Sequence, residues 1–276
     1  MNVILSRKGM DSGSGGIPSL ILPDGVMLSL PIPDAESGLS YESLSYKGQS
    51  LRDLIQQVSP SFPFSQNETC HLDPDIYPDL DGRPAGWCPA FGQCGSSGAH
   101  LDRMGVKTGD LFLFYGMYRQ TEYRPDGKLR YCPGAPVRHI IYGYLRVGDI
   151  LRVPAEIKSR CPRHPHAVHS ERRGNRLYIP DACGTFSFHD SLLLTKPGQP
   201  NRSLWSLPAF FGMDGITISW HGGRRPVLKD GRAELNVARR GQEFVIQTDT
   251  GEARRHLTDW TESLLRHVRV PLKPQE

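Results

Sequence analysis

The sequence lacks the marks of a membrane, secreted or zinc-ribbon protein. No stretch approaches the roughly 18 apolar residues that a membrane-spanning helix needs. The segment MNVILSRKGM places its apolar residues before its basic pair, the reverse of a signal peptide. The six cysteines never form a C-x-x-C pair, which excludes zinc-ribbon spacing. We therefore expect a cytoplasmic chain without a membrane partner, whose thiols are reduced and mostly buried.

Familiar nucleotide and nucleophile motifs are absent as well. The glycine- and serine-rich segment 9–16 has neither the Walker nor the Rossmann glycine spacing. The sequence contains no G-x-S-x-G nucleophile elbow, so a hydrolase triad has little support. Neither an internal repeat nor a long polar linker interrupts the 276 residues. We therefore expect one domain over residues 1–276 rather than two separable ones.

Strand signals dominate what the sequence does contain. The run KTGDLFLFYG predicts a strand over 110–118. Further strands are expected at 3–6, 129–132, 138–147, 149–153, 176–179, 192–194, 216–220, 233–237 and 243–247. The pair Asp24-Gly25 between apolar runs predicts a hairpin over 20–32.

Helix signals are fewer and short. Ser50, followed three residues later by Asp53, predicts a capped helix over 51–58. Other helices are expected over 96–104, 163–171 and 257–268. The pattern predicts an α+β fold rich in β-structure, either a barrel or a strongly bent mixed sheet, with a few short flanking helices and long loops.

Ionisable side chains gather between Cys70 and Tyr118. His71 and Asp73 have the H-x-D spacing, which points both side chains the same way from an extended segment, so that they can share a divalent metal. Asp75 and His100 are near enough in sequence to complete such a site or to act as acids and bases. The alternative is that the aspartates cap turns around Pro74.

An iron oxygenase would need a further histidine, and an arginine for a co-substrate carboxylate. His221 and Arg224 can be nominated, although their spacing does not single them out. The His164-Pro-His166-x-x-His169 tract is dense in imidazoles, but we interpret it as a surface helix.

A second set of residues suits a nucleotide. Gln93 can hydrogen-bond a base edge, and the free amides around Ser96 and Ser97, at a helix start, can hold an anion. Alternatively, this is only a glycine-rich turn that leads into a helix. Tyr115 belongs to an aromatic set on neighbouring strands that either fills the core or stacks a base.

The glycine-rich segment offers Arg7, Lys8 and Ser12 as ligand-binding groups. Asp11 is either a turn residue or an acid at the ligand. The charge balance, 33 basic against 29 acidic residues, is too even to indicate nucleic-acid binding by itself. Its distribution fits DNA or a nucleotide better, because arginine pairs at 172–173, 224–225, 239–240 and 254–255 follow an acidic segment over 73–81. A solvated mixed-charge surface is the alternative.

Several segments together carry a family resemblance. The stretches ILSRKGMDSGSGG, CHLDPD, GDLFLFYG, HIIYGYLRVG, HPH, RSLW and ARRGQEFV resemble the third type of nucleotide-modification-associated domain, from Val3 to Val245. That resemblance implies a bacterial or phage protein linked to hypermodification of DNA bases, working beside other base-modification enzymes. A looser likeness, over about residues 105–155, is to PUA-like barrels that bind modified bases.

These observations leave three functions open. The first is an enzyme of DNA-base or nucleotide modification that uses the residues named above, with acid–base work by His71 or an aspartate. The second is a non-catalytic reader of modified bases. The third is a metal-dependent oxygenase that uses His71 and Asp73.

Overall fold

The computed structural model describes residues 1–66, 68–221, 225–237 and 243–272. Its main sheet contains eleven strands among these residues. Seven of them follow the order β15 (Ile216–Ile218), β18 (Glu243–Thr248), β1 (Val3–Arg7), β10 (Leu111–Tyr123), β12 (Arg138–Leu151), β13 (Arg176–Phe186) and β19 (Val268–Leu272). The others are β2 (Ser19–Ile21), β3 (Met27–Leu28), β9 (Phe91–Gln93) and β11 (Leu129–Tyr131).

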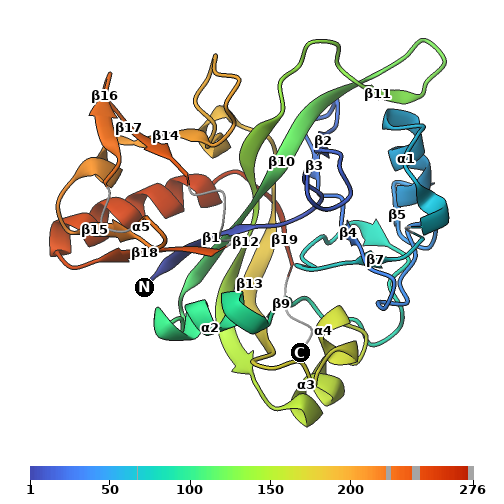
Figure 1. Ribbon diagram of the computed structural model, residues 1–276, viewed down its shortest axis with the longest axis horizontal. Coiled ribbons are helices and arrows are strands. Elements are labelled where there is room, and N and C mark those ends of the chain that lie inside the picture. Colours follow the sequence, from blue (N-terminus) through green and yellow to red (C-terminus); the bar gives the residue numbers. More distant parts are fainter. Residues whose placement is uncertain (67, 222–224, 238–242, 273–276) are drawn as a thin grey trace.

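The sheet is mixed and strongly curled. Strand β1 runs parallel to β10 and antiparallel to β18, while β10, β12 and β13 form an antiparallel series. Register shifts interrupt the β10–β12 and β12–β13 ladders, and bulges of this kind bend a sheet. Figure 1 shows β10 and β12 crossing the centre of the half-barrel that results. The prediction of a β-rich fold with a strongly bent mixed sheet is confirmed.

Three small sheets accompany the main one. They are β14 (Leu204–Pro208), β17 (Arg232–Asn236) and β16 (Val227–Lys229); β4 (Ile32–Pro33) with β7 (Cys70–His71); and β6 (Gln49–Ser50), β5 (Ser45–Tyr46) and β8 (Leu80–Asp81). The β4–β7 pair matters for function, because its register puts Ile32 opposite His71 and brings the following Asp34 beside that histidine.

The helices are α1 (Leu51–Val58), α2 (Gly95–Arg103), α3 (Pro154–Arg160), α4 (Pro165–Val168) and α5 (Gly251–Leu265), with 3₁₀ turns at Phe64–Gln66, Asp190–Leu192 and Ala209–Gly212. Helix α1 has the predicted bounds, and Ser50 Oγ accepts the predicted cap bond from Asp53 N at 3.0 Å. Figure 1 shows α5 and α1 at opposite sides of the sheet and α2 to α4 at its lower end. No described helix is long and apolar enough to span a membrane.

Several local predictions are wrong. Residues 192–194 form no strand, because Asp190–Leu192 is a 3₁₀ turn and only an isolated bridge joins Leu193 to Ile140. The strands expected at 138–147 and 149–153 are one strand, β12. Helix α5 starts earlier than expected, because Thr250 caps it by accepting from Ala253 N at 3.1 Å.

Two predictions about side chains are also wrong. Cys88 and Cys161 form a disulfide, although reduced thiols were expected throughout. The tract 164–169 is not a surface helix, because His164 and His166 are each only 6% exposed. Its helix α4 is short and packs inward, next to β9 at the edge of β13.

Candidate functional site

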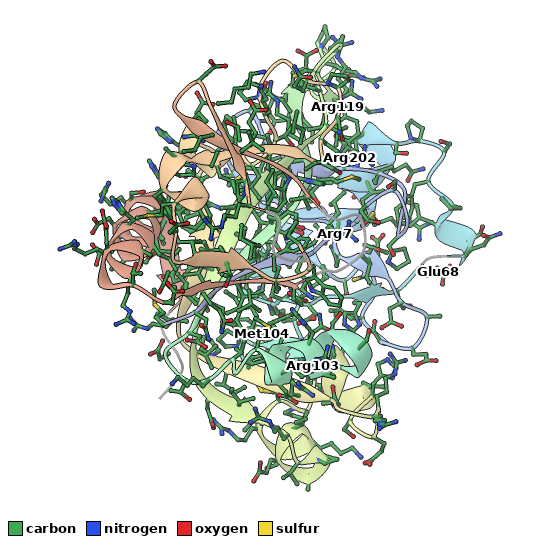
Figure 2. All side chains as sticks on the ribbon, turned by 60° about the vertical axis from the view of Figure 1, so that its left-hand side comes forward. Arg7, Glu68, Arg103, Met104, Arg119 and Arg202 are labelled. Atoms are coloured by element: carbon green, nitrogen blue, oxygen red, sulfur yellow. A yellow bond between two sulfur atoms is a disulfide. The ribbon has the colours of Figure 1, made fainter. Side chains whose placement is uncertain are left out.

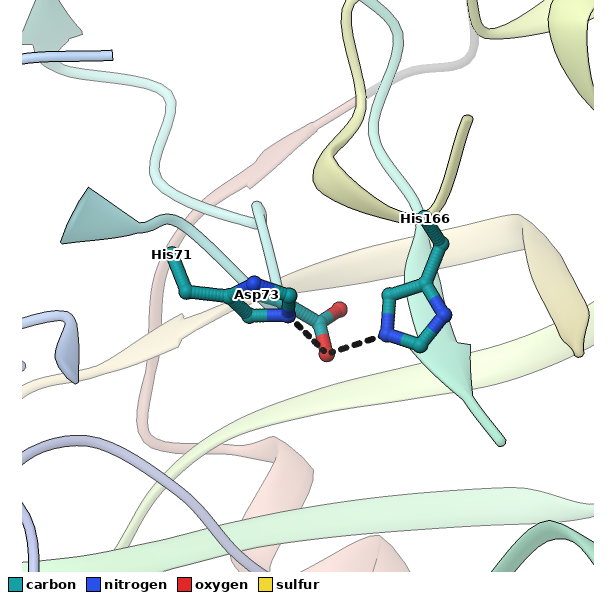
Figure 3. Close-up of side chains that lie close together, drawn as sticks. All are labelled: His71, Asp73 and His166. Carbon is teal, nitrogen blue, oxygen red and sulfur yellow. Dashed lines mark ion pairs between the residues drawn. The ribbon is translucent and has the colours of Figure 1, made fainter. Parts of the chain in front are cut away.

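Two imidazoles and a carboxylate converge where α4 meets the loop after β7. His71 Nε2 and His166 Nε2 each lie 3.8 Å from Asp73 Oδ2, and the three ligand atoms lie within 4.8 Å of one another. Figure 3 shows the two rings facing the same carboxylate from opposite sides. In a tetrahedral site with bonds of about 2.1 Å, ligand atoms are about 3.4 Å apart. For all three atoms to bind one metal ion, each imidazole nitrogen would have to approach Asp73 Oδ2 by about 0.4 Å, and the two nitrogens would have to approach each other by at most about 1.4 Å.

The far nitrogen of each imidazole is already held in place. His71 Nδ1 lies 2.9 Å from Asp34 Oδ2, and His166 Nδ1 lies 2.6 Å from Asn175 Oδ1. Because a carboxylate or amide oxygen only accepts, each Nδ1 carries the proton and each Nε2 keeps its lone pair. This arrangement is typical of metal-binding histidines, whose ring orientation depends on such outer contacts.

Asp73 is positioned from its other oxygen. Its Oδ1 accepts a 2.7 Å bond from Gly92 N and lies 3.4 Å from His164 Nε2. His164 Nδ1 in turn accepts from His166 N at 3.2 Å, so Nε2 carries the His164 proton. Oδ2 therefore remains the oxygen that faces the two free imidazole nitrogens.

Burial and charge set the protonation states of the cluster. Burial lowers the pKa of His166 to about 4 and holds the pKa of His71 below its ordinary value. Burial also opposes ionisation of Asp73, but the close imidazoles of His164 and His166 and the charge of Lys8 outweigh it, so the pKa of Asp73 is well below normal. Neutral imidazoles and an ionised carboxylate are the forms that bind a metal.

The cluster forms part of a pocket of about 370 Å³. Among the predicted residues, the pocket lining includes Arg7, Lys8, Asp11, His71, Asp73 and Gln93. Lys8 Nζ lies 3.3 Å from Glu243 Oε1 and 4.3 Å from the centre of the Phe91 ring. Gln93 donates to the same Glu243 oxygen and accepts from Cys94 N at 3.1 Å. Its amide is thus engaged by the protein, and its predicted contact with a base edge stays a prediction.

A second chamber, of about 630 Å³, adjoins this pocket. Its lining includes Arg7, Asp11, Ser12 and Tyr115 of the predicted residues. Asp11 acts as a turn residue there, because its Oδ1 accepts from Gly13 N at 2.7 Å and from Ser14 N at 3.0 Å.

The remaining predicted site residues lie elsewhere. Asp75 is buried and bound by Arg83 at 2.8 Å and by Trp87. His100 Nε2 lies 3.0 Å from Ser219 Oγ. Ser96 and Ser97 stand in the first turn of α2, as predicted, yet of the described residues that line the two pockets none is Asp75, His100, Ser96 or Ser97.

The third candidate ligand, His166, was not among the site residues predicted from the sequence. His221, nominated for that place, has its Nδ1 2.9 Å from Ser219 O and is not in the cluster. Arg224, Arg239 and Arg240 lie outside the described residues. The signal for His166 was the H-P-H tract itself, since Pro165 at the first position of α4 fixes the histidines on either side of it.

Comparison with known proteins identifies the family. A sequence model of nucleotide modification associated domain 3 matches residues 2–247 of the 276. The chain belongs to this family. Its name associates its members with nucleotide modification. The chain matches no curated protein and no solved structure, so the likeness to PUA-like barrels stays a prediction.

Proposed function

We propose that this chain is a divalent-metal-dependent enzyme that modifies a nucleobase, in a nucleotide or in DNA. The observation that carries the proposal is the convergence of His71 Nε2, Asp73 Oδ2 and His166 Nε2, with both Nδ1 atoms bound from behind. Family membership supports the substrate class.

The donor set suits a catalytic metal. Two imidazole nitrogens and one carboxylate oxygen leave coordination positions for water and substrate, as in catalytic zinc and non-haem iron sites. A metal in that place would polarise a substrate oxygen or activate a small molecule such as water or dioxygen. The 370 Å³ pocket beside the ligands gives a substrate access to those positions.

The protein contributes charge and orientation around the ligands. Asp34, Asn175 and Gly92 fix the ligands, which lowers the reorganisation needed when the metal binds. Lys8 is held by the buried carboxylate of Glu243 and lines the pocket, so its ammonium group can stabilise negative charge that develops on a substrate.

Mass spectrometry of nucleosides tests the enzyme proposal. Digested DNA and the nucleotide pool are compared between cells that carry the wild-type gene, His166→Ala, or the control His256→Ala, which removes an exposed imidazole on α5. We expect a modified nucleoside with the wild type and with His256→Ala, and its loss with His166→Ala. If the modified nucleoside persists with folded, metal-free His166→Ala, the enzyme proposal fails, and a reader of modified bases takes its place.

A further inference from the structure

The chamber next to the metal pocket shares a wall with it. Arg7, Asp11 and Ser14 line both spaces. Arg7 Nε lies 3.6 Å from Asp11 Oδ2, so this ion pair stands between the metal pocket and the chamber. Tyr115 and Arg202 line the chamber only. A molecule that extends past the ion pair would occupy both spaces.

The chamber carries an excess of positive charge. Arg202 donates to Ser12 Oγ at 3.2 Å and forms no ion pair with a described carboxylate. Arg7 pairs with no described carboxylate other than Asp11. Two guanidinium groups therefore face one carboxylate, which itself accepts two backbone bonds. Figure 2 shows Arg7 and Arg202 in the same central part of the molecule.

A buried hydroxyl group completes the set of donors. Tyr115 lies opposite Arg7 in the β1–β10 register and is only 1% exposed. Its hydroxyl has no hydrogen-bond partner among the described residues, although Tyr115 lines the chamber. Burial raises the pKa of Tyr115 well above its ordinary value, so the hydroxyl keeps its proton. The hydroxyl can therefore donate to a ligand oxygen in the chamber.

His139 lines the chamber together with Arg7 and Arg202, and both of their charges affect its pKa. Burial, followed by the nearby charges of Arg7 and Arg202, lowers the pKa of His139 to about 3. Its Nδ1 accepts from Trp205 Nε1 at 3.0 Å, so the ring is neutral and held in position. The chamber wall therefore combines a neutral imidazole with two converging cations.

We propose that Arg7, Arg202 and Tyr115 form an oxoanion subsite that holds the phosphate of a nucleotide while its base or sugar reaches the metal pocket. This rests on the proposed function and narrows the substrate class to phosphorylated nucleosides. Two guanidinium groups and a hydroxyl come from three separate segments of the chain, and together they offer enough donors for the three free oxygens of a phosphate. Lys8, predicted as a ligand-binding group, lines the metal pocket and not the chamber.

Calorimetry on the full-length protein tests this subsite. The probes are deoxynucleoside 5′-monophosphates, the matching nucleosides, inorganic phosphate and 2-oxoglutarate. Because a charge-assisted hydrogen bond contributes about 1.5–3 kcal/mol, we expect a monophosphate to bind about 10- to 100-fold more tightly than its nucleoside. Arg202→Gln should remove most of this difference. Arg124→Gln, which removes an exposed charge on a turn, should leave it unchanged.

Two further variants test the subsite separately from the fold and from the metal centre. Tyr115→Phe removes only the hydroxyl and should weaken monophosphate binding several-fold, even if Arg202→Gln fails to fold. His166→Ala should lose metal but keep the preference for monophosphates, which separates this subsite from the metal centre. Equal binding of nucleoside and monophosphate to wild-type protein with a normal metal content would overturn the subsite alone. Displacement of inorganic phosphate by 2-oxoglutarate but not by a monophosphate would overturn it too.

Discussion

At the scale of single residues, the site depends on the candidate ligands and equally on the groups that hydrogen-bond the Nδ1 atoms of the two imidazoles. Asp34 uses one oxygen to accept from Glu36 N at 3.0 Å and the other to hold His71 Nδ1. Asp24 has the same local geometry, accepting from Val26 N at 3.1 Å and pairing with Lys47 at 2.7 Å, but it is not in the pocket. The two aspartates therefore form a matched pair for mutation.

Asp34→Ala should weaken metal binding about 10- to 100-fold without unfolding the protein, because His71 loses the acceptor that fixes its proton on Nδ1. Asp24→Ala removes a turn bond and an ion pair of the same kind and should leave the affinity unchanged. Competition with a chromophoric chelator measures both. Equal affinities of the two variants would mean that Asp34 does not support a metal ligand.

His139 gives the fold a dependence on pH. Its pKa is about 3 in the folded chain, mainly because of burial, against an ordinary value of 6.5. Between these values the unfolded chain binds the proton and the folded chain does not, so the free energy of unfolding falls as the pH drops from 6.5 towards 3. One such group contributes a slope of up to about 1.4 kcal/mol per pH unit.

His139→Asn should flatten this dependence, because asparagine cannot take up the proton while its oxygen can still accept from Trp205 Nε1. Urea unfolding at pH 4, 5, 6 and 7 measures the slope for both proteins. Parallel slopes would show that the folded chain accommodates a protonated His139.

At the scale of elements, the candidate site lies where strand β7, strand β9 and helix α4 meet. Strand β9 pairs with β13 so that Gly92 lies opposite Leu177, and α4 then packs over that glycine. A Cβ atom at position 92 would collide with the ring of His166. Only glycine lets the backbone bond Asp73 while the imidazole lies directly above it.

Gly92→Ala should therefore displace His166 and lower metal affinity at least about tenfold, while most of the sheet stays intact. Gly251→Ala, at the first position of α5 where a Cβ would meet nothing within 4 Å, is the matched control. Metal titration together with circular dichroism measures both effects. Full metal affinity in Gly92→Ala would contradict the arrangement of β9 and α4.

Local signals predicted some elements well and others poorly. Helix α1 was predictable because its cap and its apolar face lie within ten residues of sequence. The H-x-D pair was recognisable for the same reason. The place of His166 was not, because it depends on the pairing of β9 with β13, which joins residues more than 80 positions apart. Asp75 was predicted as a site residue because it is close to His71 and Asp73 in the sequence, but in the structure its carboxylate pairs with Arg83.

At the scale of the whole molecule, one hydrophobic cluster runs from β1 through β10 and β12 to α5, with residues such as Ile4, Phe112, Tyr142 and Leu257. We therefore propose that the chain forms one domain, as its lack of linkers predicted. A single calorimetric unfolding transition is expected, and two well-separated transitions would contradict this proposal.

The same scale explains how the site forms. The proposed metal ligands come from the end of β7, the loop after it and α4, and the adjoining chamber takes residues from β1, β10 and the segment before β14. Residues between Arg7 and Ser14 line both spaces, but the other walls come from segments far apart in sequence, so the two-part site forms only in the folded chain.

The most direct test of the account is the metal content of the purified protein. We expect inductively coupled plasma mass spectrometry to find about one divalent first-row metal ion per wild-type chain, and less than a tenth of that in Asp73→Ala and His166→Ala. The His256→Ala control should match the wild type. Wild-type protein that neither retains such a metal nor binds iron, manganese or zinc on reconstitution would contradict the central claim.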